Sequence, residues 1–203
     1  MKKIPTLFTR EFKKHKVVNI TPEVTPGLEW VLEGEGIATV KADGSCCAIF
    51  NDELYKRYDA KGKSIPDGAI KCQEEPDLVT GHFPCFVKCD RDNPSDKWFW
   101  EAYDEICIFV PLIYRDNSTY EAVGPHFQGN PYNLKSDILL LHGLYKIDDC
   151  PRTFECIRDY LENHAIEGIV FWKDGEPRCK IKRSDFGFKW PCENAKYNVL
   201  NIN

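Results

Sequence analysis

The chain has 203 residues, which is enough for one domain with a sizeable hydrophobic core. Hydrophobic residues make up 42% of it and charged residues 29%, as in ordinary globular proteins. No stretch approaches the ~20 apolar residues of a membrane-spanning helix, so no membrane partner is expected. The net charge of −5 does not by itself indicate a nucleic-acid binder.

Basic residues gather in two segments of this acidic chain. Residues 1–16 carry six Lys or Arg against Glu11, and residues 178–190 carry five against Asp185. Two such segments could follow a phosphate backbone, and solvated surfaces explain the same charges equally well. We treat residues 1–16 as a basic N-terminal arm. They lack the apolar core of an export signal, so a cytoplasmic, reducing location is expected.

The ten cysteines are expected to be reduced, because no export signal precedes them. The spacing also argues against a structural zinc site, since no C-x-x-C pair occurs. Cys46 and Cys47 are adjacent, and Cys85 and Cys89 are four apart. Most of the cysteines are therefore expected to pack as small apolar residues.

The first predicted elements surround a short motif. Residues 6–14 could form a short helix, and 37–41 and 45–50 predict strands. Residues 41–45 read KADGS. Side chains two apart in a strand share a face, so Lys41 and Asp43 would lie together, and Gly44 would let a ligand come close. Such an arrangement can make a lysine nucleophilic. From this pattern alone, however, a solvent-exposed turn without a catalytic role is the favoured interpretation.

The middle of the chain predicts one helix and two strands. Residues 96–104 could be helical, and the runs 106–113 and 138–141 are typical of strands. Trp98, Trp100 and Tyr103 could stack on RNA bases, but packing in the helix is favoured.

The C-terminal third predicts a helix and a hairpin. Phe154, Ile157 and Leu161 have helical spacing after Thr153. Strands 168–172 and 178–182 are joined by a turn that contains Asp-Gly. This pairing predicts Glu167 close to Lys182, with Lys180 on the same face as Lys182. A surface ion pair of little energetic value is the alternative. The whole pattern is α+β, with antiparallel sheets and few flanking helices.

The sequence resembles a known family of enzymes. KADGS, TYEAVGPHFQGNP, EGIVFW and KIKR, in this order, resemble the nucleotidyltransferase motifs of ATP-dependent polynucleotide ligases. IPTLFTREF, EPDLVTGHFPCFV, DKWFWEAY and the segment up to Pro191 are similar to the compact 5′-3′ RNA ligases of vertebrates, phages and large DNA viruses. The resemblance runs from about Ile4 to Pro191 and implies a single nucleotidyltransferase (adenylation) domain over 1–203.

The resemblance implies an RNA ligase that works through a lysyl-AMP intermediate. Lys41 would attack the α-phosphate of ATP, AMP would pass to an RNA 5′-phosphate, and a 3′-hydroxyl would then displace AMP, a reaction suited to RNA repair. A free lysine has a pKa of ~10.4, so an amine at neutral pH needs a shift of about three units, or roughly 4 kcal/mol. Partial burial and a nearby Mg²⁺ would both help.

The resemblance also assigns roles to the remaining residues. Asp43, Glu121 and Glu167 would hold Mg²⁺ (or Mn²⁺), directly or through water. Lys180 and Lys182 would neutralise phosphates as charge builds up. The expected nucleotide contacts are Thr39, Val40, Lys41, Arg57, Glu121, His142, Lys180 and Lys182. Glu121 is expected on a fixed loop, and His142 either stacks on the base or is a satisfied core histidine.

Only 20 residues follow Arg183. An OB-fold domain is therefore not expected, which argues against typical DNA ligases and mRNA capping enzymes. The expected partner is RNA with 5′-phosphate and 3′-hydroxyl ends, bound by a monomer. The alternatives are a DNA nick ligase, a GMP-transferring enzyme, or a catalytically silent protein that binds RNA ends.

Overall fold

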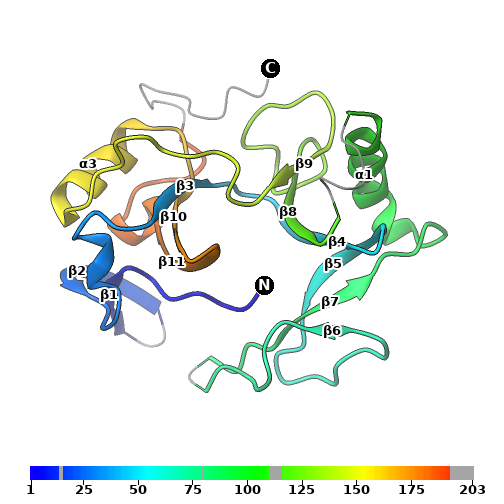
Figure 1. Ribbon diagram of the computed structural model, residues 1–203, viewed down its shortest axis with the longest axis horizontal. Helices are drawn as coiled ribbons and strands as arrows, with labels where there is room; N and C mark the ends of the chain where they lie inside the picture. Colours follow the sequence, from blue (N-terminus) through cyan, green and yellow to red (C-terminus); the bar gives the residue numbers. More distant parts are fainter. Residues whose placement is uncertain (14–15, 79, 110–115, 193–203) are drawn as a thin grey trace. The chain divides into compact units, whose positions relative to one another are not determined.

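The computed structural model describes residues 1–13, 16–78, 80–109 and 116–192, and they form two compact units (Figure 1). The first unit consists of Met1–Lys3 and Asp43–His142. The second consists of Ile4–Ala42 and the described residues from Gly143 on. The expectation of a single domain over 1–203 stays a prediction.

The first unit is built on a six-stranded antiparallel sheet in the order β6-β7-β5-β4-β8-β9. Its elements are β4 (Ser45–Phe50), β5 (Glu53–Asp59), β6 (Ile70–Lys71), β7 (Pro84–Lys88), η2 (Pro94–Asp96), α1 (Lys97–Phe109), β8 (Ser118–Val123) and β9 (Ile138–Leu141). Its core includes Ile49, Leu54 and Tyr120, and Trp98, Phe99 and Trp100 of α1 pack against it. The predicted packing role of these aromatic residues is therefore confirmed.

The second unit contains a two-stranded and a three-stranded antiparallel sheet. Its elements are β1 (Phe8–Lys13), β2 (Lys16–Val24), η1 (Glu29–Val31), β3 (Ile37–Lys41), α3 (Phe154–Asn163), β10 (Gly168–Lys173), β11 (Glu176–Lys182) and η3 (Arg183–Phe186). The three-stranded sheet has the order β11-β10-β3. Ile169, Phe171, Cys179 and Ile181 point from it into the core, together with Ile157 of α3.

Successive side chains of a strand point to opposite faces of the sheet, and this alternation places two lysines on the face opposite the core. In β11, Cys179 and Ile181 are fully buried, whereas Lys180 and Lys182 are only partly covered. The two lysines therefore lie on the face opposite the core, as predicted.

Most of the predicted elements are confirmed, including the strands near 37–41, 45–50, 138–141, 168–172 and 178–182 and the helix after Thr153. The Thr153 hydroxyl accepts a hydrogen bond from the Cys156 N–H at 3.3 Å and caps α3. The sheet-rich described structure, with its antiparallel strands and two α-helices, is of the α+β class.

Two predictions are wrong. The helix predicted at 6–14 is wrong over 8–13, because Phe8–Lys13 pair with β2 as a strand. The strand predicted at 106–113 is wrong over 106–109, which belong to α1, and 110–113 lie outside the described residues. β-Branched and aromatic residues in this run favour a strand locally, but they also suit a helix that packs on a sheet.

The basic N-terminal segment is part of the fold rather than a detachable arm. Leu7 and Phe8 are buried in the core of the second unit, and the Leu7 N–H donates to the Lys180 carbonyl at 2.8 Å. Lys14 lies outside the described residues. In the described part of the chain, no helix is both long and apolar enough to cross a membrane.

Candidate functional site

Three strands of the second unit align Lys41, Gly168 and Lys182 in one row. Gly168 of β10 is paired with Lys182 of β11 on one side and with Lys41 of β3 on the other. Residues directly opposite one another in an antiparallel sheet share a face, so both lysines flank a position without a side chain. Lys41, the first residue of the KADGS motif, is the last residue of β3, and Lys182 is the last residue of β11 in the predicted hairpin.

Glu167, which directly precedes this row, joins the two lysines. Lys41 Nζ donates to Glu167 Oε2 at 2.5 Å, and Lys182 Nζ donates to Glu167 Oε1. Glu167 is only 7% exposed, and its carbonyl accepts the Arg183 N–H at 2.9 Å. The predicted proximity of Glu167 to Lys182 is confirmed. Because this carboxylate is largely withdrawn from water, both contacts are stronger than surface ion pairs.

Lys180 adds a third ammonium group to this face. Burial, together with the positive charges of Lys41, Lys182 and Arg10, lowers its pKa to about 8, against the opposite effect of Glu167. Arg10 Nη2 donates to Asp185 Oδ1 at 2.5 Å, whereas its buried Nε has no hydrogen-bond partner among the described residues. The surplus of positive charge around Glu167 suits a ligand that brings its own negative charge, such as a phosphate.

The segment before Lys41 is more engaged than expected. Val40 is an expected nucleotide contact, and its N–H donates to the Tyr145 carbonyl at 2.8 Å. Thr39 is 2% exposed, and its hydroxyl accepts from Trp172 Nε1 at 2.8 Å. Recognition of adenine by these two residues stays a prediction.

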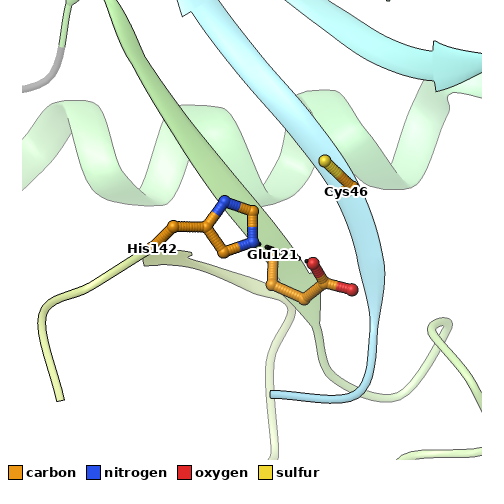
Figure 2. Close-up of side chains that lie close together, drawn as sticks. All are labelled: Cys46, Glu121 and His142. Atoms are coloured by element: carbon orange, nitrogen blue, oxygen red, sulfur yellow. Dashed lines mark hydrogen bonds and ion pairs between the residues drawn. The ribbon is translucent and has the colours of Figure 1, made fainter. Parts of the chain in front are cut away.

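The first unit contains a separate cluster of functional groups. Glu121 lies in strand β8, so the prediction of a loop at this position is wrong. Its Oε1 accepts the Gly44 N–H at 3.1 Å, and its Oε2 lies 3.0 Å from His142 Nε2. Figure 2 shows the His142 ring directed toward the Glu121 carboxylate, with Cys46 on the neighbouring strand β4.

Cys46 is a member of this cluster that the sequence did not reveal. Burial, together with the charge of Glu121, raises the pKa of the Cys46 thiol to about 11, whereas Arg57 opposes the shift. No sequence spacing could have indicated this residue, because its proximity to Glu121 depends on the pairing of β4 with β8.

Gly44 has a structural role beside the expected functional one. A β-carbon at Gly44 would lie 2.2 Å from the Ala122 carbonyl oxygen, so the strands β4 and β8 require a glycine there. The preceding residue, Asp43, donates its backbone N–H to the Tyr132 hydroxyl oxygen at 2.6 Å.

Two of the expected Mg²⁺ ligands have partners within their own unit. Both carboxylate oxygens of Glu167 bind lysine ammonium groups, and Glu121 lies with a thiol and an imidazole. Mg²⁺ binding by Asp43, Glu121 and Glu167 stays a prediction.

Comparison with known proteins identifies the family. The RNA ligase 1 family profile matches residues 101–202, which include Glu121, His142, Glu167, Lys180 and Lys182. The chain belongs to the RNA ligase 1 family.

Its relatives include three proteins named RNA ligase 1. The Danio rerio protein is 26% identical, and the alignment covers 81% of this chain and 71% of that protein. The proteins of Pongo abelii and Rattus norvegicus are 23% and 25% identical, with 82% of this chain and 73% of each relative covered.

Proposed function

We propose that this protein joins RNA ends by ATP-dependent nucleotidyl transfer, with Lys41 as the nucleophile. Membership of the RNA ligase 1 family supports RNA ligation. The observation that carries the mechanism is the bridge from Glu167 to Lys41 and Lys182, beside the buried Lys180. A carboxylate that holds two lysines on one sheet face is suited to phosphoryl chemistry, where positioning and charge neutralisation supply most of the catalysis.

The proposed reaction has three steps. Lys41 Nζ, after loss of one proton, forms a bond to the α-phosphorus of ATP as the bond to pyrophosphate breaks. An oxygen of the RNA 5′-phosphate then attacks the same phosphorus, and Lys41 leaves with its electron pair. Finally an RNA 3′-hydroxyl loses its proton, attacks the 5′-phosphorus and displaces AMP, which completes the phosphodiester bond.

In the proposed reaction, residues of the second unit position the nucleophile and neutralise the phosphates. Glu167 holds Lys41 Nζ in place, because the 2.5 Å contact restricts the flexible lysine side chain. Lys180 and Lys182 neutralise the phosphate oxygens as negative charge moves toward the leaving pyrophosphate. The placement of both lysines on one strand face, two residues apart, supports this assignment.

Nucleotide contacts from Thr39, Val40, Arg57, Glu121 and His142 are proposed on the resemblance alone. A divalent ion, Mg²⁺ or Mn²⁺, would neutralise charge on the triphosphate. Asp43, Glu121 and Glu167 are proposed on the same basis to hold this ion, directly or through water.

Intact mass after incubation with ATP and Mg²⁺ tests the proposal. We expect a mass increase of one AMP that peptide mapping places on Lys41. Lys41→Ala should abolish the adduct, whereas Lys146→Ala, which removes an exposed lysine of the same unit, should retain it. An adduct that persists in Lys41→Ala would refute the assigned nucleophile.

The alternatives are separated by the adduct assay with each nucleotide and by sealing assays with RNA and DNA ends. A GMP-transferring enzyme would form the adduct with GTP instead of ATP. A DNA nick ligase would seal 5′-phosphorylated DNA nicks and fail on RNA ends. A silent RNA-end-binding protein would bind RNA and form no adduct with either nucleotide.

A further inference from the structure

Three strand segments of the first unit bring a thiol, a carboxylate and an imidazole together. Cys46 of β4 is the direct register partner of Glu121 of β8, so the two side chains share a face. His142 follows β9, and its N–H donates to the Thr119 carbonyl of β8 at 3.1 Å. The sulfur, oxygen and nitrogen donor atoms all lie within 4.8 Å of one another.

We infer that Cys46, Glu121 and His142 form a binding site for a thiophilic divalent transition-metal ion of the Zn²⁺ class. The donor set itself supports this class. Thiolate and imidazole ligands select zinc and neighbouring transition metals, whereas Mg²⁺ and Ca²⁺ select oxygen ligands. The inference concerns metal binding alone and does not depend on the proposed ligase reaction.

Neighbouring groups hold two of the three ligands in orientation. His142 Nδ1 lies 3.0 Å from Thr119 Oγ1, which can accept its proton and leave Nε2 as the ligand atom. Glu121 Oε1 accepts the Gly44 N–H at 3.1 Å, which leaves Oε2 directed at the cluster. Metal-binding histidines and carboxylates in proteins are commonly fixed by outer contacts of this kind.

The site is incomplete by one ligand. Three protein ligands leave the fourth tetrahedral position of Zn²⁺ to water or to a bound molecule. Cys46 and Gly44 also line an open cavity of about 350 Å³, together with Lys56, Arg57 and Phe99. On binding, the metal replaces the proton of the Cys46 thiol, which passes to water, and the oxidation states do not change.

Titration with Co²⁺ under reducing, chelator-free conditions tests the inference on the full chain without nucleotide or RNA. Tetrahedral Co²⁺ with a thiolate ligand gives intense visible bands and a near-ultraviolet sulfur-to-metal charge-transfer band. We expect both, at one ion per chain, and we expect Zn²⁺ to displace the Co²⁺ and bleach them. Failure of the wild-type chain to give the charge-transfer band would overturn the inference.

Variants identify the ligands. Cys46→Ser should abolish the charge-transfer band, whereas Cys156→Ser, at an exposed cysteine of α3, should retain it. Glu121→Gln and His142→Ala should each weaken Co²⁺ binding at least about tenfold, as should Thr119→Val through loss of the outer contact.

Circular dichroism of each metal-free variant controls for folding. A charge-transfer band that persists in a folded Cys46→Ser protein would assign the metal to another thiol and refute the site.

Discussion

One carboxylate, that of Glu167, balances two ammonium groups in the second unit. Glu167→Gln keeps the shape of the side chain but removes its charge, so Lys41 and Lys182 lose their common partner. We expect the rate of lysyl-AMP formation to fall by about 10²–10³-fold, because Lys41 is no longer held in position. The free energy of unfolding should also fall by about 2–3 kcal/mol, since Glu167 is largely buried.

Glu176→Gln is the matched control for this prediction. Glu176 lies in the same hairpin but is exposed, so its substitution should leave both quantities within error. Adduct formation by quenched-flow mass spectrometry and urea unfolding measure the two effects. Equal behaviour of the two variants would show that the Glu167 contacts contribute neither to positioning nor to stability.

Lys180 should make the stability of the protein depend on pH. Burial lowers its pKa from the ordinary value of 10.5 to about 8 in the folded protein. Below pH 8 both states carry the proton, and the folded state bears the cost of a buried ammonium. Between pH 8 and 10.5 the unfolded state binds more protons than the folded one, so the stability contribution of Lys180 rises with pH, by up to about 3 kcal/mol.

Lys180→Met tests this sign. The variant should be more stable than the wild type below pH 8, and the difference should shrink as pH rises toward 10.5. Urea unfolding of both proteins at pH 7, 8, 9 and 10 gives the difference directly. A difference that stays constant over this range would show that Lys180 does not have a lowered pKa.

The β10–β11 pair depends on the absence of a side chain at Gly168. A β-carbon there would lie 2.2 Å from the Ile181 carbonyl oxygen, so Gly168→Ala must push the two strands apart. We expect a loss of stability of about 2–3 kcal/mol and a drop in adduct formation, because the Lys41–Gly168–Lys182 row is disturbed. Thermal unfolding and the adduct assay measure both.

Gly175→Ala separates this steric effect from backbone strain. Gly175 lies in the turn of the same hairpin at φ +74°, with no atom close to its missing β-carbon. The alanine should cost about 1 kcal/mol of conformational strain and leave adduct formation intact. Loss of the adduct to the same extent in both variants would contradict the proposed role of the row.

Local elements of the second unit were predictable, and their long-range pairing was not. The Asp-Gly turn between two apolar runs indicated the β10–β11 hairpin, and hairpin register then placed Glu167 near Lys182. The pairing of β3 with β10 joins residues more than 120 positions apart. No local pattern reports such a pairing, so from the residues alone Lys41 could be linked to Glu167 only through the family resemblance.

The same limit applies to the first unit. Glu121 was expected on a loop because Gly124 and Pro125 follow it, yet it pairs with Cys46 of β4 and with Leu140 of β9. Cys46 joined the Glu121–His142 pair only through this sheet. The helix α1 was partly mistaken for a strand, because its residues Ile106, Ile108 and Phe109 favour strands locally and tertiary packing decides otherwise.

The described residues are organised around two hydrophobic cores. Among the described residues, the core clusters of the two units share no member. Each unit is discontinuous in sequence, and the chain crosses from one to the other at 3–4, 42–43 and 142–143. A substitution in one core should therefore act first on the strands that pack on it.

Ile169→Ala and Ile49→Ala test whether a substitution in one core acts mainly on the strands that pack on that core. Both isoleucines are fully buried, one in each core, and each substitution should cost about 3 kcal/mol through the cavity it leaves. In hydrogen exchange with mass spectrometry, Ile169→Ala should speed exchange in 168–182 and leave 45–59 unchanged, and Ile49→Ala should do the reverse. Equal acceleration of both segments by either variant would mean that the two cores open together as one cooperative unit.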